Sequence, residues 1–386
     1  MDFNLSDEQV MLRESVRHFA AKELKPIAEE VDREDRWPAG MWKKLGALGV
    51  LGITIDPDYG GAGADILSGA LVVEELARVL PAVSLSYGAH ANLCCHNLFV
   101  NGTEAQKLKY LPPLCSGDHV GALGLTEPNA GSDAVSIQTA ARREGDHYIL
   151  NGRKTFITNG PDADTIVLYA KTDKAAGPKG ITAFILDTKF PGFSVSRALE
   201  KVGNRGSRTG ELVLEDCRIP AENVLGRENA GIAVMMRGLD VERAFLSTFA
   251  LGIAEGAFAE ALKYSRERVQ FGKPIASFQL IQAKLADMYT LIEASRLMCY
   301  KACILAGHAE RGGKGTEVHK LAAAAILFTA EACDKVCTEA VQIHGGYGYC
   351  LEYPVQRFWR DAKLGTLGAG TSEMRRLIIA RELLMP

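Results

Sequence analysis

The sequence lacks the motifs that usually mark nucleotide, metal and hydrolase sites. No GxGxxG joins a strand pattern to a helix, and GxxxxGK[ST], HExxH and GxSxG are absent. These absences disfavour a Rossmann or P-loop nucleotide site, a zinc-protease site and a nucleophile elbow. The Gly-rich run Tyr59–Asp65 follows no strand pattern, so we expect a plain loop there.

Closely paired metal-binding cysteines are lacking as well, since the nine cysteines form no CxxC. Cys299/Cys303 and Cys333/Cys337 lie four residues apart in segments with a helical pattern, so each pair could place two thiols on one helix face, as a zinc site needs. No histidine stands at ligand spacing beside either pair. We therefore expect reduced cysteines in the core and no metal site.

A large excess of one charge and a targeting segment are also missing. Lys plus Arg number 44 and Asp plus Glu 47, a net charge of -3, which argues against a nucleic-acid-binding surface. The start MDFNLSDEQ resembles neither a secretory signal nor an Arg-rich transit peptide. The most apolar stretches, such as LAAAAILFTA, are too short to span a bilayer. We expect the bacterial cytoplasm or the mature mitochondrial matrix, without a membrane span.

The residue pattern changes along the 386 residues of the chain, from helical to strand-like and back to helical. Residues 1–117 read as helices, beginning with a capping box at Ser6–Gln9. Residues 118–232 hold short segments rich in β-branched and aromatic residues, and residues 233–386 return to long helices. Because strands and helices do not alternate, we predict an α+β multidomain fold rather than a doubly wound one.

Two local patterns mark the middle segment. YILNGRKTF predicts a hairpin with Asn151 and Gly152 at its turn. TFITNG places Thr158 at the end of a strand.

Several further motifs are each weak evidence alone; LDVER by itself is more typical of a solvated helix face. The set comprises GLTEPNAGSD (124–133), TFITNG (155–160), LDVER (239–243), RERVQFGKPI (266–275), QIHGGYGY (342–349), RDAKL (360–364) and GTSEMRRLIIAREL (370–383).

Together, and with SYGAHANLC (86–94), these motifs resemble the acyl-CoA dehydrogenase family, especially its isovaleryl-type branch, over essentially the whole chain. The resemblance implies an N-terminal helical domain, a middle β-domain and a C-terminal four-helix-bundle domain. It also implies FAD, an acyl-CoA substrate, electron-transferring flavoprotein as electron acceptor, and a homotetramer.

The resemblance also implies which residues meet FAD. Thr126 would bond the flavin ring, Phe156 and Thr158 would cover its other side, and Arg268 would meet the pyrophosphate from the neighbouring subunit. Phe156 stands where many relatives have tryptophan. The full predicted set is Leu123, Leu125, Thr126, Ser132, Phe156, Ile157, Thr158, Arg268, Phe271, Gln279, Gln342, Ile343, His344, Gly345, Gly346, Thr371, Ser372 and Glu373.

The reaction of this family needs a base that removes the α-proton of a thioester, and a carboxylate in an apolar pocket suits that task. Many members carry the base as Glu just before the final Gly-Thr, where this sequence has Ala369. The isovaleryl-type branch instead uses the Glu of its LDxER helix, which here is Glu242. We predict Glu242 as the base, against an exposed and merely paired Glu; Glu127 and Glu373 are its rivals.

Residues around the base would hold the substrate, with the Ala369 N–H bound to the thioester oxygen and Asp240, Arg243 and Ser132 near CoA. The resemblance implies a short branched, isovaleryl-CoA-like substrate. Gly365, however, replaces an aromatic residue of the isovaleryl-type loop, so a bulkier aryl or cyclic acyl-CoA is the alternative substrate. The predicted set is Ser132, Asp240, Val241, Glu242, Arg243, Gly365, Gly368, Ala369 and Gly370.

Three other functions stay open at this point. An acyl-CoA oxidase would keep the fold and pass electrons to oxygen. A flavin- or acyl-CoA-binding protein without chemistry would account for the missing loop Glu. A helical scaffold without any ligand is the third.

Overall fold

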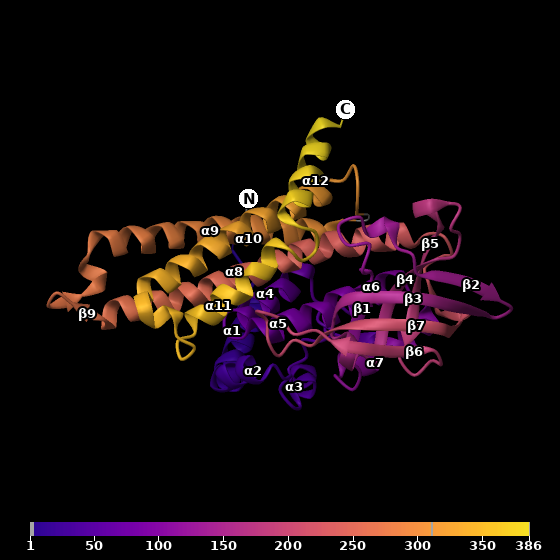
Figure 1. Cartoon of the computed structure of the whole chain (residues 1–386), viewed down its shortest axis with the longest axis horizontal. Coiled ribbons are helices and arrows are strands. Elements are labelled where there is room, and N and C mark those ends of the chain that lie inside the picture. Colours follow the sequence, from indigo (N-terminus) through magenta and orange to yellow (C-terminus); the bar gives the residue numbers. More distant parts are fainter. Residues whose placement is uncertain (1–3, 310–311, 386) are drawn as a thin grey trace.

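A computed structural model describes residues 4–309 and 312–385 of the chain. Helices form one half of the molecule and a β-domain the other (Figure 1). The N-terminal part contains α1 (Asp7–Phe19), α2 (Ala28–Glu34), α3 (Met41–Ala47), α4 (Ile66–Ala77), α5 (Pro81–Gly88), α6 (Asn97–Asn101) and α7 (Glu104–Cys115). The capping box is confirmed, because the Ser6 hydroxyl accepts from Gln9 N–H and the Gln9 side chain accepts from Ser6 N–H.

The middle part is an eight-stranded sheet of order β6-β7-β3-β2-β4-β5-β8, with β1 paired in parallel to β4. Its strands are β1 (Gly121–Gly124), β2 (Ala140–Glu144), β3 (His147–Thr158), β4 (Thr165–Lys171), β5 (Ile181–Asp187), β6 (Phe193–Ala198), β7 (Thr209–Pro220) and β8 (Val224–Leu225). β3 ends at Thr158, as predicted.

The predicted hairpin turn at Asn151 and Gly152 is wrong. β3 runs straight through both residues, and the turn of the hairpin is Gly145–Asp146, between β2 and β3. A Cβ on Gly152 would lie 2.8 Å from the Cα of Thr139, so the glycine allows two backbones to approach closely. The Asn-Gly pair therefore serves strand packing and an irregular register with β7 rather than a turn.

The C-terminal part is built on three long helices: α8 (Gly231–Glu267), α9 (Gln279–His308) and α10 (Glu317–His344). Two short strands, β9 (Val269–Gln270) and β10 (Lys273–Pro274), join α8 to α9 at the far tip, and α11 (Val355–Ala362) and α12 (Ser372–Leu384) follow. In Figure 1, α12 stands away from the body of the molecule.

By length and composition α8 could cross a membrane, so the expectation that apolar stretches are too short fails for this helix. Its most apolar window is 67% buried inside the protein, however, which is the pattern of a core helix. The helix packs against α4, α9 and α10 and reaches β5, so it connects the helical body to the β-domain.

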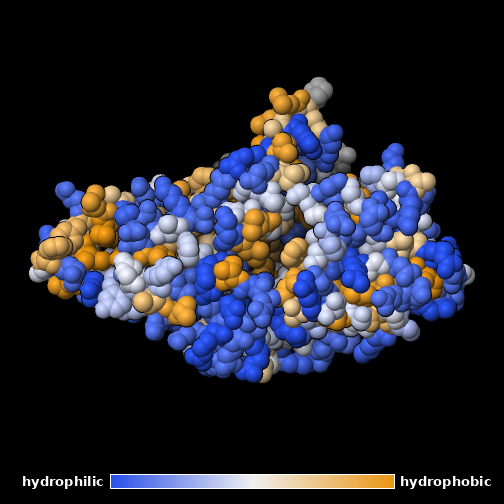
Figure 2. Space-filling view, viewed as in Figure 1, coloured by the Kyte–Doolittle hydropathy of each residue, from blue (hydrophilic) through white to orange (hydrophobic). Residues whose placement is uncertain are grey.

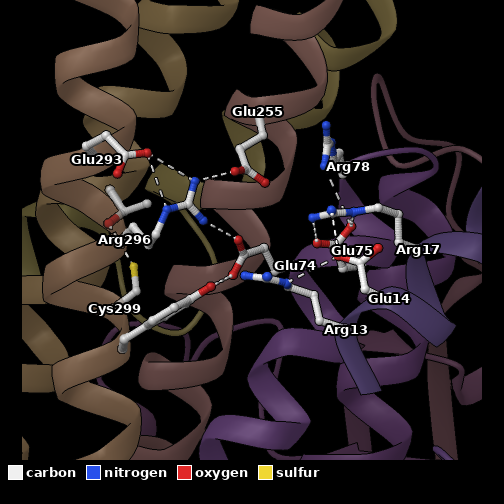
Figure 3. Close-up of polar contacts among 12 residues, drawn as sticks. Arg13, Glu14, Arg17, Glu74, Glu75, Arg78, Glu255, Glu293, Arg296 and Cys299 are labelled. Carbon is white, nitrogen blue, oxygen red and sulfur yellow. Dashed lines mark hydrogen bonds and ion pairs between the residues drawn. The ribbon is translucent and has the colours of Figure 1, made fainter. Parts of the chain in front are cut away.

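Buried charges tie the N-terminal helices to the C-terminal ones (Figure 3). Glu74 of α4 accepts hydrogen bonds from Arg296 Nη1 (2.6 Å) and from the Tyr300 hydroxyl (2.9 Å), both on α9. Arg296 also pairs with Glu255 of α8. This Glu74 cluster joins three helices from distant parts of the sequence.

The cysteines are free, and all but Cys350 are buried. The sulfurs of Cys333 and Cys337 lie 3.9 Å apart on α10. Burial raises the pKa values of Cys94 and Cys299 to about 12, so these thiols are protonated. The eight buried cysteines therefore pack as small apolar side chains, as predicted, whereas Cys350 is exposed.

Candidate active site

Glu242 lies on the face of α8 that also carries Met235, Gly238, Leu239 and Leu246, because these positions recur at helical spacing. Three of them, together with residues of the β-domain and of the N-terminal helices, line a narrow apolar pocket. The lining residues are Leu93, Asn97, Leu123, Leu125, Tyr169, Met235, Gly238 and Leu239. In Figure 2 the surface is hollowed between the helical body and the β-domain, with apolar side chains in the hollow.

The Glu242 carboxylate accepts no hydrogen bond from any residue that the structure describes. Burial raises its pKa to about 7, and the positive charges of Arg243 and Arg375 limit the rise. A carboxylate with that pKa can both take up and release a proton near neutral pH, which is what a general base must do.

The rival Glu127 is held inside the β-domain. It accepts hydrogen bonds from Lys154 Nζ (2.8 Å), Thr139 N (3.0 Å) and Gln138 N (2.5 Å). Burial would raise its pKa, but the Lys154 ammonium and these hydrogen bonds outweigh burial and keep the pKa below its usual range. Glu127 is therefore a structural anion.

The other rival, Glu373, is exposed in the first turn of α12. A hydrogen bond from its own backbone N–H and one from Thr371 lower its pKa. An exposed carboxylate that stays ionised is a poor match for the base.

The loop before α12 has an unusual backbone. Ala369 has φ +53° and Gly370 φ +93°, so a non-glycine residue occupies the left-handed region. Arg243 Nε donates to Ala369 O (3.4 Å), which joins this loop to α8 one residue after Glu242. Strained loop residues of this kind cluster at functional sites.

The side chain of Asp240, predicted to lie near CoA, is directed into the protein. It accepts hydrogen bonds from Arg243 Nη1 (2.8 Å), Gly313 N (2.6 Å) and the His319 ring (2.7 Å). With 1% of its surface exposed, Asp240 is placed to orient Arg243. Val241 is also buried, whereas Ser132 is exposed.

Two segments predicted to flank the flavin lie together. Thr155 N donates to Thr126 O (2.9 Å), so the end of β3 runs beside the loop after β1. Phe156 has φ +58° and is 69% exposed, while Ile157 is buried and Thr158 half-buried. An exposed ring held on a strained backbone fits a surface that an aromatic cofactor covers.

The remaining predicted cofactor residues fall into two places. Thr371 caps α12 beside the loop, accepting from Met374 N (3.4 Å), and Ser372 is buried next to it. Arg268, Phe271 and Gln279 instead lie at the far tip of the bundle.

The tip lies far from Glu242, since Arg268 follows it by 26 residues along α8, about 39 Å of helix. Arg268 and Glu242 of one chain therefore lie well apart along α8. Phe271 is 93% exposed, and Figure 2 shows apolar side chains gathered at this tip.

The glycine pair at the end of α10 leaves backbone uncovered near the tip. Among the described residues, no atom lies within 4 Å of a Cβ placed on Gly345 or Gly346. The Gln342 side chain is exposed, but Ile343 and His344 are buried and His344 stacks on Tyr264 at 4.2 Å. The side chains of Ile343 and His344 are therefore covered by the protein itself.

Gly365, predicted to widen the acyl pocket, is buried between α8 and α10. A Cβ placed on it would lie 3.4 Å from the Ala330 Cβ and 3.8 Å from the Ala250 Cβ. A Cβ on Gly368 would lie 3.6 Å from Leu246 Cδ2. The loop thus packs along the face of α8 that carries Glu242.

Two side chains near Glu242, Tyr169 and Arg375, are not among the site residues predicted from the sequence. Tyr169 is buried and its hydroxyl accepts from Asn97 Nδ2 (3.3 Å) in the apolar pocket. Arg375 is buried completely beside Glu242 and Arg243. The available signal for Arg375 was the pair of arginines, Arg375 and Arg376, ahead of the apolar run that starts at Leu377. Tyr169 sits in a strand with no polar pattern.

Comparison with known proteins identifies the family. The models of the acyl-CoA dehydrogenase N-terminal, middle and C-terminal domains match residues 6–118, 122–217 and 229–384. The chain is 50% identical over 384 residues to the mitochondrial isovaleryl-CoA dehydrogenase of Pongo abelii, covering 98% of this chain and 89% of that one.

Solved structures agree. Butyryl-CoA dehydrogenase from Megasphaera elsdenii matches with a TM-score of 0.96 and 44% identity, over 100% of both chains. A chain from a structural study of the electron transferring flavoprotein of Acidaminococcus fermentans and flavin-based electron bifurcation matches with a TM-score of 0.97 and 45% identity, also over 100% of both.

The chain belongs to the acyl-CoA dehydrogenase family. It is an FAD-dependent oxidoreductase with the three-part α+β fold of that family. The scaffold without ligand is thereby excluded.

Proposed function

We propose that the chain dehydrogenates a short branched acyl-CoA between Cα and Cβ to give the 2-enoyl-CoA, with Glu242 as the base. The observation that supports this most is a carboxylate with a pKa near 7 and no hydrogen-bond donor among the described residues, on the pocket face of α8. Bound FAD supplies the two-electron acceptor for the hydride that leaves Cβ. Glu242 takes the α-proton, so both hydrogens of the substrate are accounted for.

The Ala369 N–H is our candidate for the thioester oxygen. Backbone N–H groups that point at developing negative charge can contribute a large part of such catalysis. Among the described residues, no acceptor binds this N–H, so it is available to a ligand.

Short branched acyl groups are favoured over bulky ones by the packing of the loop. A Cβ placed on Gly365 would already lie 3.4 Å from the Ala330 Cβ and 3.8 Å from the Ala250 Cβ, so this position leaves little room for an aryl ring. The 50% identity to an isovaleryl-CoA dehydrogenase agrees with this preference. The bulkier substrate remains the alternative.

We further propose that the chain forms a homotetramer in which Arg268 meets the cofactor of a neighbouring subunit. The 39 Å or so along α8 between Arg268 and the Glu242 site and the exposed apolar tip support this. Electron transferring flavoprotein is the proposed acceptor of the electrons.

The test is an acyl-CoA panel in which bleaching of the flavin absorbance is followed without oxygen. We expect isovaleryl-CoA to reduce the flavin with a higher kcat/KM than butyryl-CoA or an aryl-bearing thioester. Fastest reduction by the aryl thioester would contradict the branched-substrate proposal. Peroxide formed in stoichiometric amounts during aerobic turnover would favour the oxidase alternative.

A further inference from the structure

Arg375 is unusual because it is an arginine with 0% of its surface exposed, the largest fully buried side chain among the described residues. Its Nη1 donates to Gly365 O (2.8 Å) and its Nη2 to Gly368 O (2.5 Å). Burying a guanidinium is costly unless hydrogen bonds are made, and the Arg375 Nε is buried without a partner. The two bonds to carbonyl oxygens therefore hold the guanidinium in one position. The loop before α12 is in turn fixed by the guanidinium.

The bond to Gly368 O determines where the next N–H points. A peptide unit is planar and trans, so the C=O of Gly368 and the N–H of Ala369 point in opposite directions. With the carbonyl on Arg375, the Ala369 N–H is directed away from the guanidinium. The next peptide is fixed in the same manner, because its carbonyl, Ala369 O, accepts from Arg243 Nε (3.4 Å).

The guanidinium also faces the base. The charged or titratable groups around Glu242 are Arg243 of α8, Arg375 of α12 and the Tyr169 hydroxyl of β4. Arg375 itself faces Arg243, Glu242, Glu331 of α10 and Glu373. Burial lowers the pKa of Arg375 to about 10, which leaves it positively charged at neutral pH.

We propose that Arg375 is a positioning residue for the dehydrogenation, which aims the Ala369 N–H at the thioester oxygen and places a positive charge beside Glu242. This inference rests on the proposed function, in which Glu242 is the base and Ala369 the donor.

The test separates proton abstraction from flavin reduction. The ligand 3,3-dimethylbutyryl-CoA has α-hydrogens but no hydrogen on Cβ, so it can exchange its α-hydrogens and cannot be dehydrogenated. Exchange with D2O, read by mass spectrometry on the FAD-loaded enzyme across pH, reports the base and the thioester donor. An infrared titration of the Glu242 carboxyl, assigned by its loss in Glu242→Gln, gives a second readout without turnover.

In Arg375→Gln the amide can replace one hydrogen bond but carries no charge. We expect the pH midpoint for exchange, and the infrared midpoint, to rise by on the order of one pH unit. Arg375→Lys keeps the positive charge but cannot hold both carbonyl oxygens in the geometry of a guanidinium. We therefore expect its pH midpoint for exchange to stay within roughly a few tenths of a unit of wild type, while its exchange rate falls about tenfold or more. Arg376→Gln removes a charge from the exposed neighbour and should change neither value.

Wild-type midpoint and rate in both Arg375 variants would overturn the inference, provided that Glu242→Gln is inert. Wild-type exchange in Glu242→Gln would instead overturn the proposed base. If Arg375→Gln does not fold, Arg375→Lys decides alone, and a wild-type exchange rate in that variant contradicts the inference.

Discussion

Two glutamates on neighbouring helices, Glu74 of α4 and Glu242 of α8, share a raised pKa but differ in their partners. Burial raises the pKa of Glu74 above its usual range and that of Glu242 to about 7. Glu74 accepts hydrogen bonds from Arg296 and Tyr300, whereas Glu242 accepts none from the residues that the structure describes. A perturbed pKa alone therefore does not identify a base; the missing partner is what distinguishes Glu242.

The difference follows from what each carboxylate does. The Glu74 cluster joins α4, α8 and α9 through a guanidinium with fixed geometry (Figure 3). A base must exchange its proton with a substrate, so it needs an open position and an apolar wall. Glu242 has no hydrogen-bond donor among the described residues, and it lies on the face of α8 whose preceding residues Met235, Gly238 and Leu239 line the apolar pocket.

The largest effect is expected from breaking the Glu74 cluster. Arg296→Met should leave Glu74 and Glu255 buried without their cation and lower the free energy of unfolding by about 3–5 kcal/mol. The flavin-reduction rate per folded molecule should stay near wild type. Chemical denaturation measures the free energy of unfolding, and stopped-flow absorbance measures the flavin-reduction rate. A loss of flavin reduction with unchanged stability would contradict a purely structural role for the Glu74 cluster.

A smaller effect is expected at the far end of α8. Arg268→Ala should weaken FAD retention by about 1.5–3 kcal/mol, because the proposed charge-assisted hydrogen bond to the pyrophosphate would be lost. FAD content after dialysis and subunit number by light scattering measure this. Full FAD occupancy and unchanged assembly would contradict the contact between subunits.

The loop beside Glu242 should control the acyl group. Gly365→Tyr adds a ring against Ala330 and Ala250 and should change the kcat/KM ratio of isovaleryl-CoA to an aryl-bearing thioester by about 1–3 kcal/mol in favour of the small substrate. Gly365→Ala, whose Cβ fits, is the control. An unmoved ratio in a folded tyrosine variant would show that this position does not shape the pocket.

The smallest expected effect is the pH dependence of the flavin-reduction rate, which is also the simplest to measure. Glu242 acts as a base only when deprotonated, so flavin reduction should fall as pH drops through about 7, by about tenfold per unit well below the pKa. Glu74→Gln should leave that limb in place. A flavin-reduction rate that does not change from pH 5 to 8 would contradict Glu242 as the base.

The sequence predicted the order of helices, β-domain and helices because periodicity and turn residues are local signals. It failed at Asn151 and Gly152, where the close approach of Thr139 overrode the turn propensity of the pair. It singled out Glu242 through motif resemblance. The role of Arg375 depends on which carbonyls fold onto it, and no spacing in the sequence encodes that.

The central claim, that Glu242 is the base, is tested most directly by single-turnover flavin reduction in Glu242→Gln, with Glu74→Gln as the matched control. Glu242→Gln should keep FAD and thioester binding and reduce its flavin about 10²–10⁴-fold more slowly than wild type, because the swap keeps the shape and removes the base. Glu74→Gln should reduce its flavin at nearly the wild-type rate per folded molecule. A near-wild-type rate in Glu242→Gln would contradict the account.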